Sequence, residues 1–219
     1  MLESIRVEHT TNGGEAASAQ RSAAGGPSES AEQSVLRGAD FDTRRYRNAL
    51  GRFASGVTVI TAHYQGRAHG MTANSFVSVS LDPPLVLVSL GNQSSMHRIL
   101  PAAQRYGISV LGEDQESLSN HFAGRIGPGV PAPFIEREGV PLLEGAVAYF
   151  VVQLEQAHPA GDHTLYIGRV EHFEWNDDRP LLFYAGRYRH LRAEKGAAGP
   201  WEQDDSSLFS IGGFDPPAG

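Results

Sequence analysis

Short strand-like segments recur at close intervals through the middle of this chain, and they limit the possible folds more than any other feature. The segments are rich in β-branched residues or alternate apolar with small polar residues, as strands do. Helix-like segments are fewer, and they do not alternate with the strands as in a β-α-β protein. The strand-like segments are 57–63, 76–80, 85–90, 106–111, 146–156, 164–175 and 181–184. This pattern predicts a mainly β protein, a barrel or sandwich with short flanking helices, rather than a doubly wound sheet.

The first expected helix has apolar residues at the i, i+3, i+4 and i+7 positions of 46–53. Asp42 is placed to cap its N-terminus, and Gly56 is a candidate terminator. A second short helix is expected over 94–100, where Pro101 should end or kink it.

A third helix is expected over 114–122, and a loop rich in proline and glycine over 124–141. Asp82-Pro83-Pro84 should break the chain between two strands. The second of these strands, 85–90, is almost wholly apolar, which is typical of a strand covered on both faces.

The two ends of the chain differ in composition from the middle. Residues 1–39 contain no Phe, Trp or Tyr, and such a segment buries too little apolar surface to fold, so we expect a disordered tail. Residues 193–219 include several large apolar side chains, and we expect a loose tail or a docking arm. The formal net charge of −7 comes mainly from these ends. The body, 40–192, is close to neutral, which argues against a non-specific nucleic-acid-binding protein.

Several classes of chemistry have no sequence support. The chain has no cysteine, so disulfides, thiolate nucleophiles and iron–sulfur clusters are excluded. It has neither of the usual glycine-rich nucleotide loops, no serine-hydrolase elbow and no zinc-protease motif. His158 and His163 flank a Pro- and Gly-containing turn, which is a poor metal site, and we expect no metal. Without a membrane-length apolar run or a secretory leader, we expect a cytoplasmic protein.

Two segments concentrate short polar side chains at the ends of strands. They are Gly70–Phe76, between two expected strands, and Gly91–Ser95, between a strand and a helix start. Hydroxyl groups and free backbone amides at a helix N-terminus can hold an anion without a lysine. The same residues are also common in ordinary turns and caps, and this alternative stays open.

The order of several motifs resembles the flavin reductase-like domain family. The motifs are RNALGRFASGVTVITA (47–62), GMTANSFVSVSLDPPLVLVSL (70–90), SSMHRIL (94–100), FAGR (122–125), GDHTLYIGRVE (161–171) and LLFYAGRY (181–188). The resemblance covers about residues 40–192. It implies an FMN-binding split barrel, an antiparallel β-barrel of six to eight strands with short helices.

The resemblance also implies a set of flavin-binding residues. Thr72, Ala73, Asn74 and Ser75 would line the ring edge and the ribityl chain, while Ser89, Leu90, Ser94 and Arg125 would lie on the phosphate side. Ala54, Ser55 and Thr58 would approach the ring system, and Tyr188 belongs to the closing motif. His163 would face the flavin where nicotinamide stacks, as the one candidate catalytic residue.

The implied activity is hydride transfer from NADH or NADPH to FMN or FAD. Reduced flavin would then serve a separate monooxygenase, and the protein would be a homodimer. One alternative is an FMN enzyme that resembles pyridoxamine phosphate oxidase, although a single lysine, Lys195, offers little for a basic phosphate pocket. Another alternative is a flavin-binding or electron-carrier protein without catalysis.

Overall fold

The computed structural model describes residues 41–125 and 132–192. The tails expected at 1–39 and 193–219 lie outside the described residues, so both stay predictions. Within the described ranges, no helix is long and apolar enough to cross a membrane.

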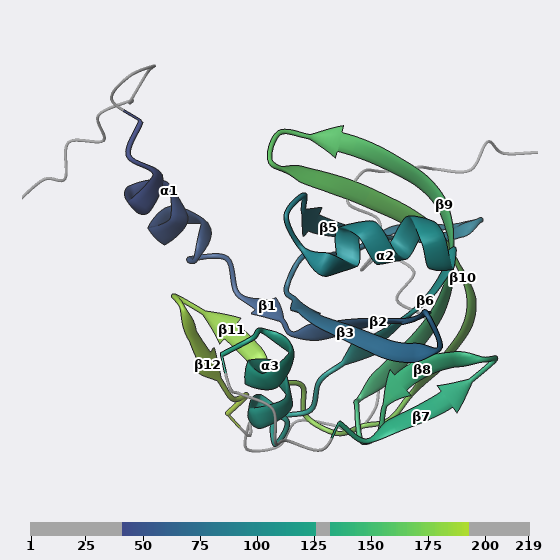
Figure 1. Cartoon of the computed structure of the whole chain (residues 1–219). Coiled ribbons are helices and arrows are strands. Elements are labelled where there is room, and N and C mark those ends of the chain that lie inside the picture. Colours follow the sequence, from purple (N-terminus) through teal and green to yellow (C-terminus); the bar gives the residue numbers. More distant parts are fainter. Residues whose placement is uncertain (1–40, 126–131, 193–219) are drawn as a thin grey trace, which may run out of the picture. The chain divides into compact units, whose positions relative to one another are not determined.

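A seven-stranded antiparallel sheet dominates the described part of the chain (Figure 1). Its strands, in spatial order, are β3 (Arg67–Ala73), β2 (Thr58–Tyr64), β6 (Arg105–Val110), β9 (Ala148–Ala160), β10 (His163–Trp175), β5 (Pro84–Gly91) and β4 (Phe76–Leu81). The expectation of a mainly β, antiparallel protein is therefore confirmed. Strands β9 and β10 form a long hairpin whose turn carries Gly161 and Asp162.

Two smaller sheets complete the architecture. β1 (Ser55–Gly56), β11 (Leu182–Tyr184) and β12 (Arg187–Arg189) form one, and β7 (Phe134–Arg137) pairs with β8 (Val140–Leu143) in the other. The prediction of a loop throughout 124–141 is therefore wrong in its second half. Pro133 and Pro141 flank or join strands there, and Gly139 lies at φ +74° in the tight β7–β8 turn.

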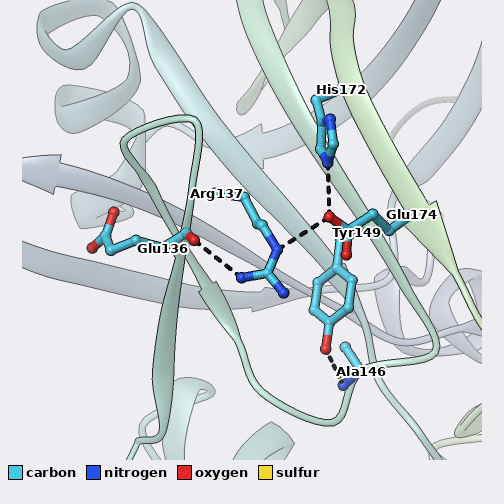
Figure 2. A network of polar contacts seen from close by, with 6 residues as sticks. All are labelled: Glu136, Arg137, Ala146, Tyr149, His172 and Glu174. Carbon is cyan, nitrogen blue, oxygen red and sulfur yellow. Dashed lines mark hydrogen bonds and ion pairs between the residues drawn. The ribbon is translucent and has the colours of Figure 1, made fainter.

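The β7–β8 hairpin is tied to the long hairpin by charged groups (Figure 2). Arg137 Nε donates to Glu174 Oε1 at 3.1 Å, and His172 Nε2 lies 2.9 Å from the same oxygen. The hydrogen bond with His172, followed by Arg137, holds the pKa of the Glu174 carboxyl below its ordinary value. Nearby, the Tyr149 hydroxyl accepts from the backbone N–H of Ala146.

Within the described residues, three helices accompany the sheets: α1 (Thr43–Leu50), α2 (Ser95–Ala103) and α3 (Glu116–Phe122). The predicted cap is confirmed, because Asp42 Oδ1 accepts from the backbone N–H groups of Arg44 and Arg45. The predicted terminator is wrong: the C-cap is Gly51, and Gly56 lies in β1.

Proline does not end α2 where we expected, since Pro101 lies inside the helix and Ala103 is its last residue. Met96, Ile99 and Leu100 of α2 are buried against the main sheet in the largest core cluster, which also contains Ile60, Leu90, Tyr106 and Tyr166. Along β5, buried Val86, Val88 and Leu90 alternate with half-buried residues, so this strand is fully covered on one face only. The prediction from its apolar sequence, cover on both faces, therefore overestimated the burial of this strand.

Candidate functional site

The first polar segment is mostly strand rather than turn. Thr72 and Ala73 end β3, and only Asn74 and Ser75 form the bend that leads into β4. Helix α3 packs closely here, because a Cβ placed on Gly70 would lie 2.5 Å from Cε1 of Phe122. The missing side chain at Gly70 thus lets α3 approach β3, and Thr72 Oγ1 donates to the Ser119 carbonyl at 2.7 Å.

The first polar segment is hydrogen-bonded to the strand that leads into the second, through Ser75 and Ser89. Ser75 Oγ donates to the Ser89 carbonyl at 2.7 Å and accepts from the Ser89 backbone N–H at 3.2 Å. These bonds extend the antiparallel pairing of β4 with β5, in which Phe76 lies opposite Val88. The end of β3 is thereby held beside the end of β5, two residues before Gly91.

A cavity of about 170 Å³ lies beside the β3–β4 bend, and we call it the bend cavity. Five predicted site residues line it: Thr72, Ala73, Asn74, Arg125 and Tyr188. The Tyr188 hydroxyl lies 2.8 Å from Ser119 Oγ and donates to Asn120 Oδ1 at 3.2 Å. Helix α3 therefore fixes polar groups on both walls, through Thr72 and Tyr188.

A second cavity, of about 440 Å³, lies where β5 leads into α2, and we call it the turn cavity. Its lining residues are Gly91, Asn92, Gln93, Ser94, Asp162 and His163. The β9–β10 turn reaches this place because His163 pairs with Gly91 in the sheet.

Asn92 joins the two loops of the turn cavity. Its backbone N–H donates to the Asp162 carbonyl at 3.0 Å, and its Oδ1 accepts from Thr164 Oγ1 at 2.8 Å. Ser94 caps α2, because its Oγ accepts from the His97 N–H at 3.2 Å. The predicted residues Ser94 and His163 thus share one cavity.

His163 is oriented by its neighbour in the sequence. Its Nδ1 lies 2.7 Å from Asp162 Oδ1, and this hydrogen bond is the main reason that the pKa of Asp162 lies below its ordinary value. An ionised carboxylate only accepts hydrogen bonds, so Nδ1 carries a proton. Nε2 of the neutral ring is then an acceptor, and it lies near Gly91, 3.8 Å from an added Cβ there.

The ASGVT residues lie close to the bend but make different contacts. Thr58 is buried, and its Oγ1 donates to the Ala73 carbonyl at 2.7 Å, so its hydroxyl supports the β2–β3 pair. Ser55 Oγ is buried and has no hydrogen-bond partner among the residues that the structure describes. Ala54 is exposed and precedes β1. Flavin contacts of these three residues stay predictions.

Leu90 differs from the other candidates because its side chain is 1% exposed and belongs to the core. Any contact of Leu90 with a ligand is therefore expected to use backbone atoms, whereas Ser89 is half-buried and its backbone N–H and carbonyl are bonded to Ser75. Residues that we did not predict also line the bend cavity: Val57, Ser119, Ala123 and Phe183. Ala123 lies in the FAGR motif, which could have pointed to it. Nothing in the sequence distinguished Ser119 from the other polar residues of its helix.

An antiparallel β protein with two cavities that carry hydroxyl and amide side chains is a suitable host for a nucleotide-like ligand. The sequence profile of the flavin reductase like domain matches residues 50–192. An NADH-dependent flavin reductase of Rhodococcus sp. is 49% identical over 71% of this chain and 89% of its own. The reductase component of 4-hydroxyphenylacetate 3-monooxygenase from Thermus thermophilus is 39% identical over 67% of this chain and 95% of its own. The solved flavin reductase PheA2 superposes with a TM-score of 0.69, at 44% identity, over 70% of this chain and all of its own.

This chain belongs to the flavin reductase like domain family. The family that its motifs predicted is thereby confirmed, and so is the class of activity, NAD(P)H-dependent flavin reduction.

The unpartnered donors at the bend cavity fit a flavin. Asn74 and Arg125 line the bend cavity, and their side chains make no hydrogen bond or ion pair with another described residue. The buried Ser55 hydroxyl is also unpartnered within the described ranges. Amide and guanidinium donors suit the polar ring edge and phosphate of a flavin. Across residues 41–125 and 132–192, no cluster of three or more His, Cys, Asp or Glu is arranged to hold a metal.

Proposed function

We propose that this protein uses NADH to reduce a flavin held across the bend cavity and the turn cavity. The pair of hydrogen bonds between Ser75 and Ser89 carries this proposal, because it holds the β3–β4 bend beside β5, two residues before the second polar segment begins at Gly91. When bound, the flavin supplies the redox chemistry by accepting a hydride from the nicotinamide.

The side chains at the bend cavity would bind and orient the flavin. Asn74 offers an amide donor and acceptor to the ring edge, and Thr72 keeps an acceptor lone pair while its proton is used by Ser119. Arg125 and the α2 N-terminus, with Ser94, would stabilise the phosphate side. These positions hold the ring for nicotinamide stacking without any nucleophile.

His163 would position the nicotinamide. Its Nε2, the acceptor left free by the Asp162 hydrogen bond, suits the N–H₂ donor of a carboxamide. Orientation of two reactants is itself a large source of rate enhancement, so a positioning group can slow turnover when it is lost.

We further propose three properties of the assembly. The seven-stranded sheet curls into a split barrel, the protein works in the cytoplasm where NADH is available, and it forms a homodimer. The dimer is supported by exposed apolar side chains: Phe53 after α1 is 83% exposed, and Val77, Val79 and Leu81 are exposed on the edge strand β4. Light scattering of the purified protein tests the dimer.

A separate monooxygenase would use the reduced flavin. Named relatives include reductase components of such systems, in Thermus thermophilus and in Rhodococcus jostii. A cavity lined by exposed residues such as Asn92, Gln93 and His163 supports release of the flavin rather than permanent retention.

Steady-state assays test the function directly. NADH and NADPH are each combined with FMN, FAD and riboflavin, and the loss of absorbance at 340 nm is followed. We expect flavin-dependent oxidation that is faster with NADH than with NADPH. If the protein binds flavin but oxidises neither nicotinamide, the non-catalytic alternative replaces this proposal. Oxidation of pyridoxamine phosphate without nicotinamide would instead favour the oxidase alternative.

A further inference from the structure

Helix α3 ends in a turn that fixes the backbone of Arg125 beside the bend cavity. The backbone N–H of Gly124 donates to the His121 carbonyl at 3.0 Å, and Gly124 has φ +69°. The backbone N–H of Arg125 donates to the Asn120 carbonyl, also at 3.0 Å. A left-handed glycine with this nested pair of bonds is a Schellman motif, which ends a helix in one defined backbone geometry. The position of the Arg125 backbone follows from that geometry.

Asn120, whose carbonyl holds Arg125, is itself held through its side chain. Its Oδ1 accepts from the Tyr188 hydroxyl at 3.2 Å, and the same hydroxyl lies 2.8 Å from Ser119 Oγ. A tyrosine hydroxyl has one proton, which goes to Asn120, so Ser119 is the donor of the other bond. Tyr188 lies on β12, and these bonds therefore tie the C-terminal turn of α3 to that strand.

Helix α3 is also tied to β3. Ser119 is fully buried, and its carbonyl accepts from Thr72 Oγ1 at 2.7 Å. The helix thus has a partner on each of two strands whose residues line the bend cavity, Thr72 on β3 and Tyr188 on β12. A shift of its C-terminal turn would break at least one of these bonds.

The guanidinium of Arg125, unlike its backbone, has no partner among the described residues, and Arg125 lines the bend cavity. Holding the backbone in place lowers the entropy that a long side chain loses when it binds a ligand. A planar cation with several N–H donors matches the oxygens of a phosphate. The arrangement therefore suits Arg125 to contact a phosphate-bearing ligand in this cavity.

We propose that Gly124 and Tyr188 are positioning residues, which hold Arg125 where its guanidinium contacts the phosphate of a flavin in the bend cavity. This inference rests on the proposed function, which places the flavin there. FMN and FAD carry a phosphate, and riboflavin has none. Loss of either positioning residue should therefore weaken FMN binding and leave riboflavin binding almost unaffected, whereas a residue that only shapes the cavity would affect both.

The first test measures the Kd of FMN and of riboflavin for the full chain by quenching of flavin fluorescence. We call the ratio of the riboflavin Kd to the FMN Kd the phosphate preference. Arg125→Gln should lower it about tenfold, the effect of losing charge-assisted hydrogen bonds. Tyr188→Phe removes the hydroxyl and keeps the ring, which packs edge-on against Phe183 with centroids 5.5 Å apart. It should lower the phosphate preference about threefold, because Arg125 is still present but less well placed.

Two substitutions of Gly124 separate backbone geometry from added bulk. A Cβ atom at this position would meet no atom within 4 Å, so only the positive φ opposes a side chain there. Asparagine adopts the left-handed conformation more readily than alanine does. Gly124→Ala should therefore lower the phosphate preference as Tyr188→Phe does, and Gly124→Asn should retain it.

The matched control is Gly139→Ala in the β7–β8 turn, where φ is +74° and an added Cβ would also meet no atom within 4 Å. Gly139 lines neither the bend cavity nor the turn cavity. This variant should lose about as much melting temperature as Gly124→Ala, because the backbone strain is alike, and should keep the wild-type phosphate preference. The comparison separates lost stability from a displaced Arg125.

A double-mutant cycle tests whether Gly124 acts through Arg125. If it does, adding Gly124→Ala to Arg125→Gln should lower the phosphate preference no further. Additive losses in the double variant would mean that Gly124 affects phosphate binding by another route, and they would overturn the proposal.

The proposal is also overturned if either Gly124→Ala or Tyr188→Phe keeps the wild-type phosphate preference, or if riboflavin binding weakens as much as FMN binding does. Should Arg125→Gln still lower the preference in that case, the proposed flavin site stands without its positioning residues. An unchanged preference in Arg125→Gln would remove the phosphate contact and overturn the proposal directly. If the wild-type protein binds neither FMN nor riboflavin, the proposed function itself fails, and this proposal fails with it.

Discussion

The bend cavity and the turn cavity are held in different ways. At the bend cavity, Thr72 and Tyr188 are hydrogen-bonded to α3 through Ser119, so its walls are braced by a helix. At the turn cavity, His163 and Asp162 are exposed on a hairpin turn, and their partners are each other and a neighbouring loop. From this difference we expect a separate role for each cavity. The braced bend cavity would pre-organise flavin binding, and the exposed turn cavity would admit and release nicotinamide.

The largest expected effect comes from removing polar groups at the bend. The double variant Asn74→Ala/Ser75→Ala should weaken flavin binding by about 1–3 kcal/mol, because Asn74 would lose its proposed hydrogen bonds to flavin, each roughly 0.5–1.5 kcal/mol, and Ser75 would no longer hold the bend beside β5. Quenching of flavin fluorescence measures the change, about 5- to 150-fold in Kd. Ser78→Ala, an exposed serine of β4, is the control and should keep the wild-type Kd. Equal Kd values for the double variant and the control would remove the bend from the flavin site.

A smaller and different effect is expected at the turn. His163→Ala should lower kcat/KM for NADH about tenfold and change flavin affinity less, because we propose that His163 orients nicotinamide rather than flavin. His158→Ala, an exposed histidine of the same hairpin, is the control. A loss of flavin binding as large as that of the bend variant would erase the distinction between the two cavities.

A third substitution tests the unpartnered hydroxyl near the bend. Ser55→Ala should leave the melting temperature of the flavin-free protein unchanged or slightly higher, since a buried group without a partner contributes no bond. If that hydroxyl bonds to flavin, the Kd should rise by a few-fold. Calorimetry and flavin titration separate the two effects. A destabilised flavin-free protein with wild-type Kd would show that Ser55 is structural.

The smallest effect concerns proton binding at the turn. The hydrogen bond from His163 keeps the pKa of Asp162 below its ordinary value of 3.8. The ionised Asp162 therefore stabilises the folded state above pH 3.8, and this contribution is lost as the pH falls through the lowered pKa. An NMR titration of the Asp162 carboxyl should show this lower pKa and its return to the ordinary value in His163→Ala. An unchanged value in that variant would mean that the pair does not form in solution.

The sequence predicted the family and most strands of the main sheet, because these depend on local patterns, but it missed β3, β7, β8 and β12. Alternation and β-branched runs identify β2, β6 and β10, and the ordered motifs identify the family. The Asp42 cap could be predicted for the same reason, because it depends only on neighbouring residues. Pro101 was expected to end or kink the second helix, but the helix continues to Ala103, with Ile99 and Leu100 buried just before the proline.

Contacts between residues that are distant in the sequence could not be predicted from it. The contact between Ser75 and Ser89 depends on sheet register, and the role of Ser119 depends on α3 approaching β3 at Gly70. Neither leaves a periodic signal. The ring orientation of His163 also required coordinates, although its neighbour Asp162 was visible in the motif.

Hydrogen–deuterium exchange with and without FMN tests the central claim most directly, because it reads backbone amides at both polar segments in one experiment. The account predicts that added FMN slows exchange at residues 72–75 and at residues 91–94 together, because we propose that the flavin spans the bend cavity and the turn cavity. Slower exchange at one of these segments with no change at the other, or protection confined to distant strands such as β7 and β8, would contradict it.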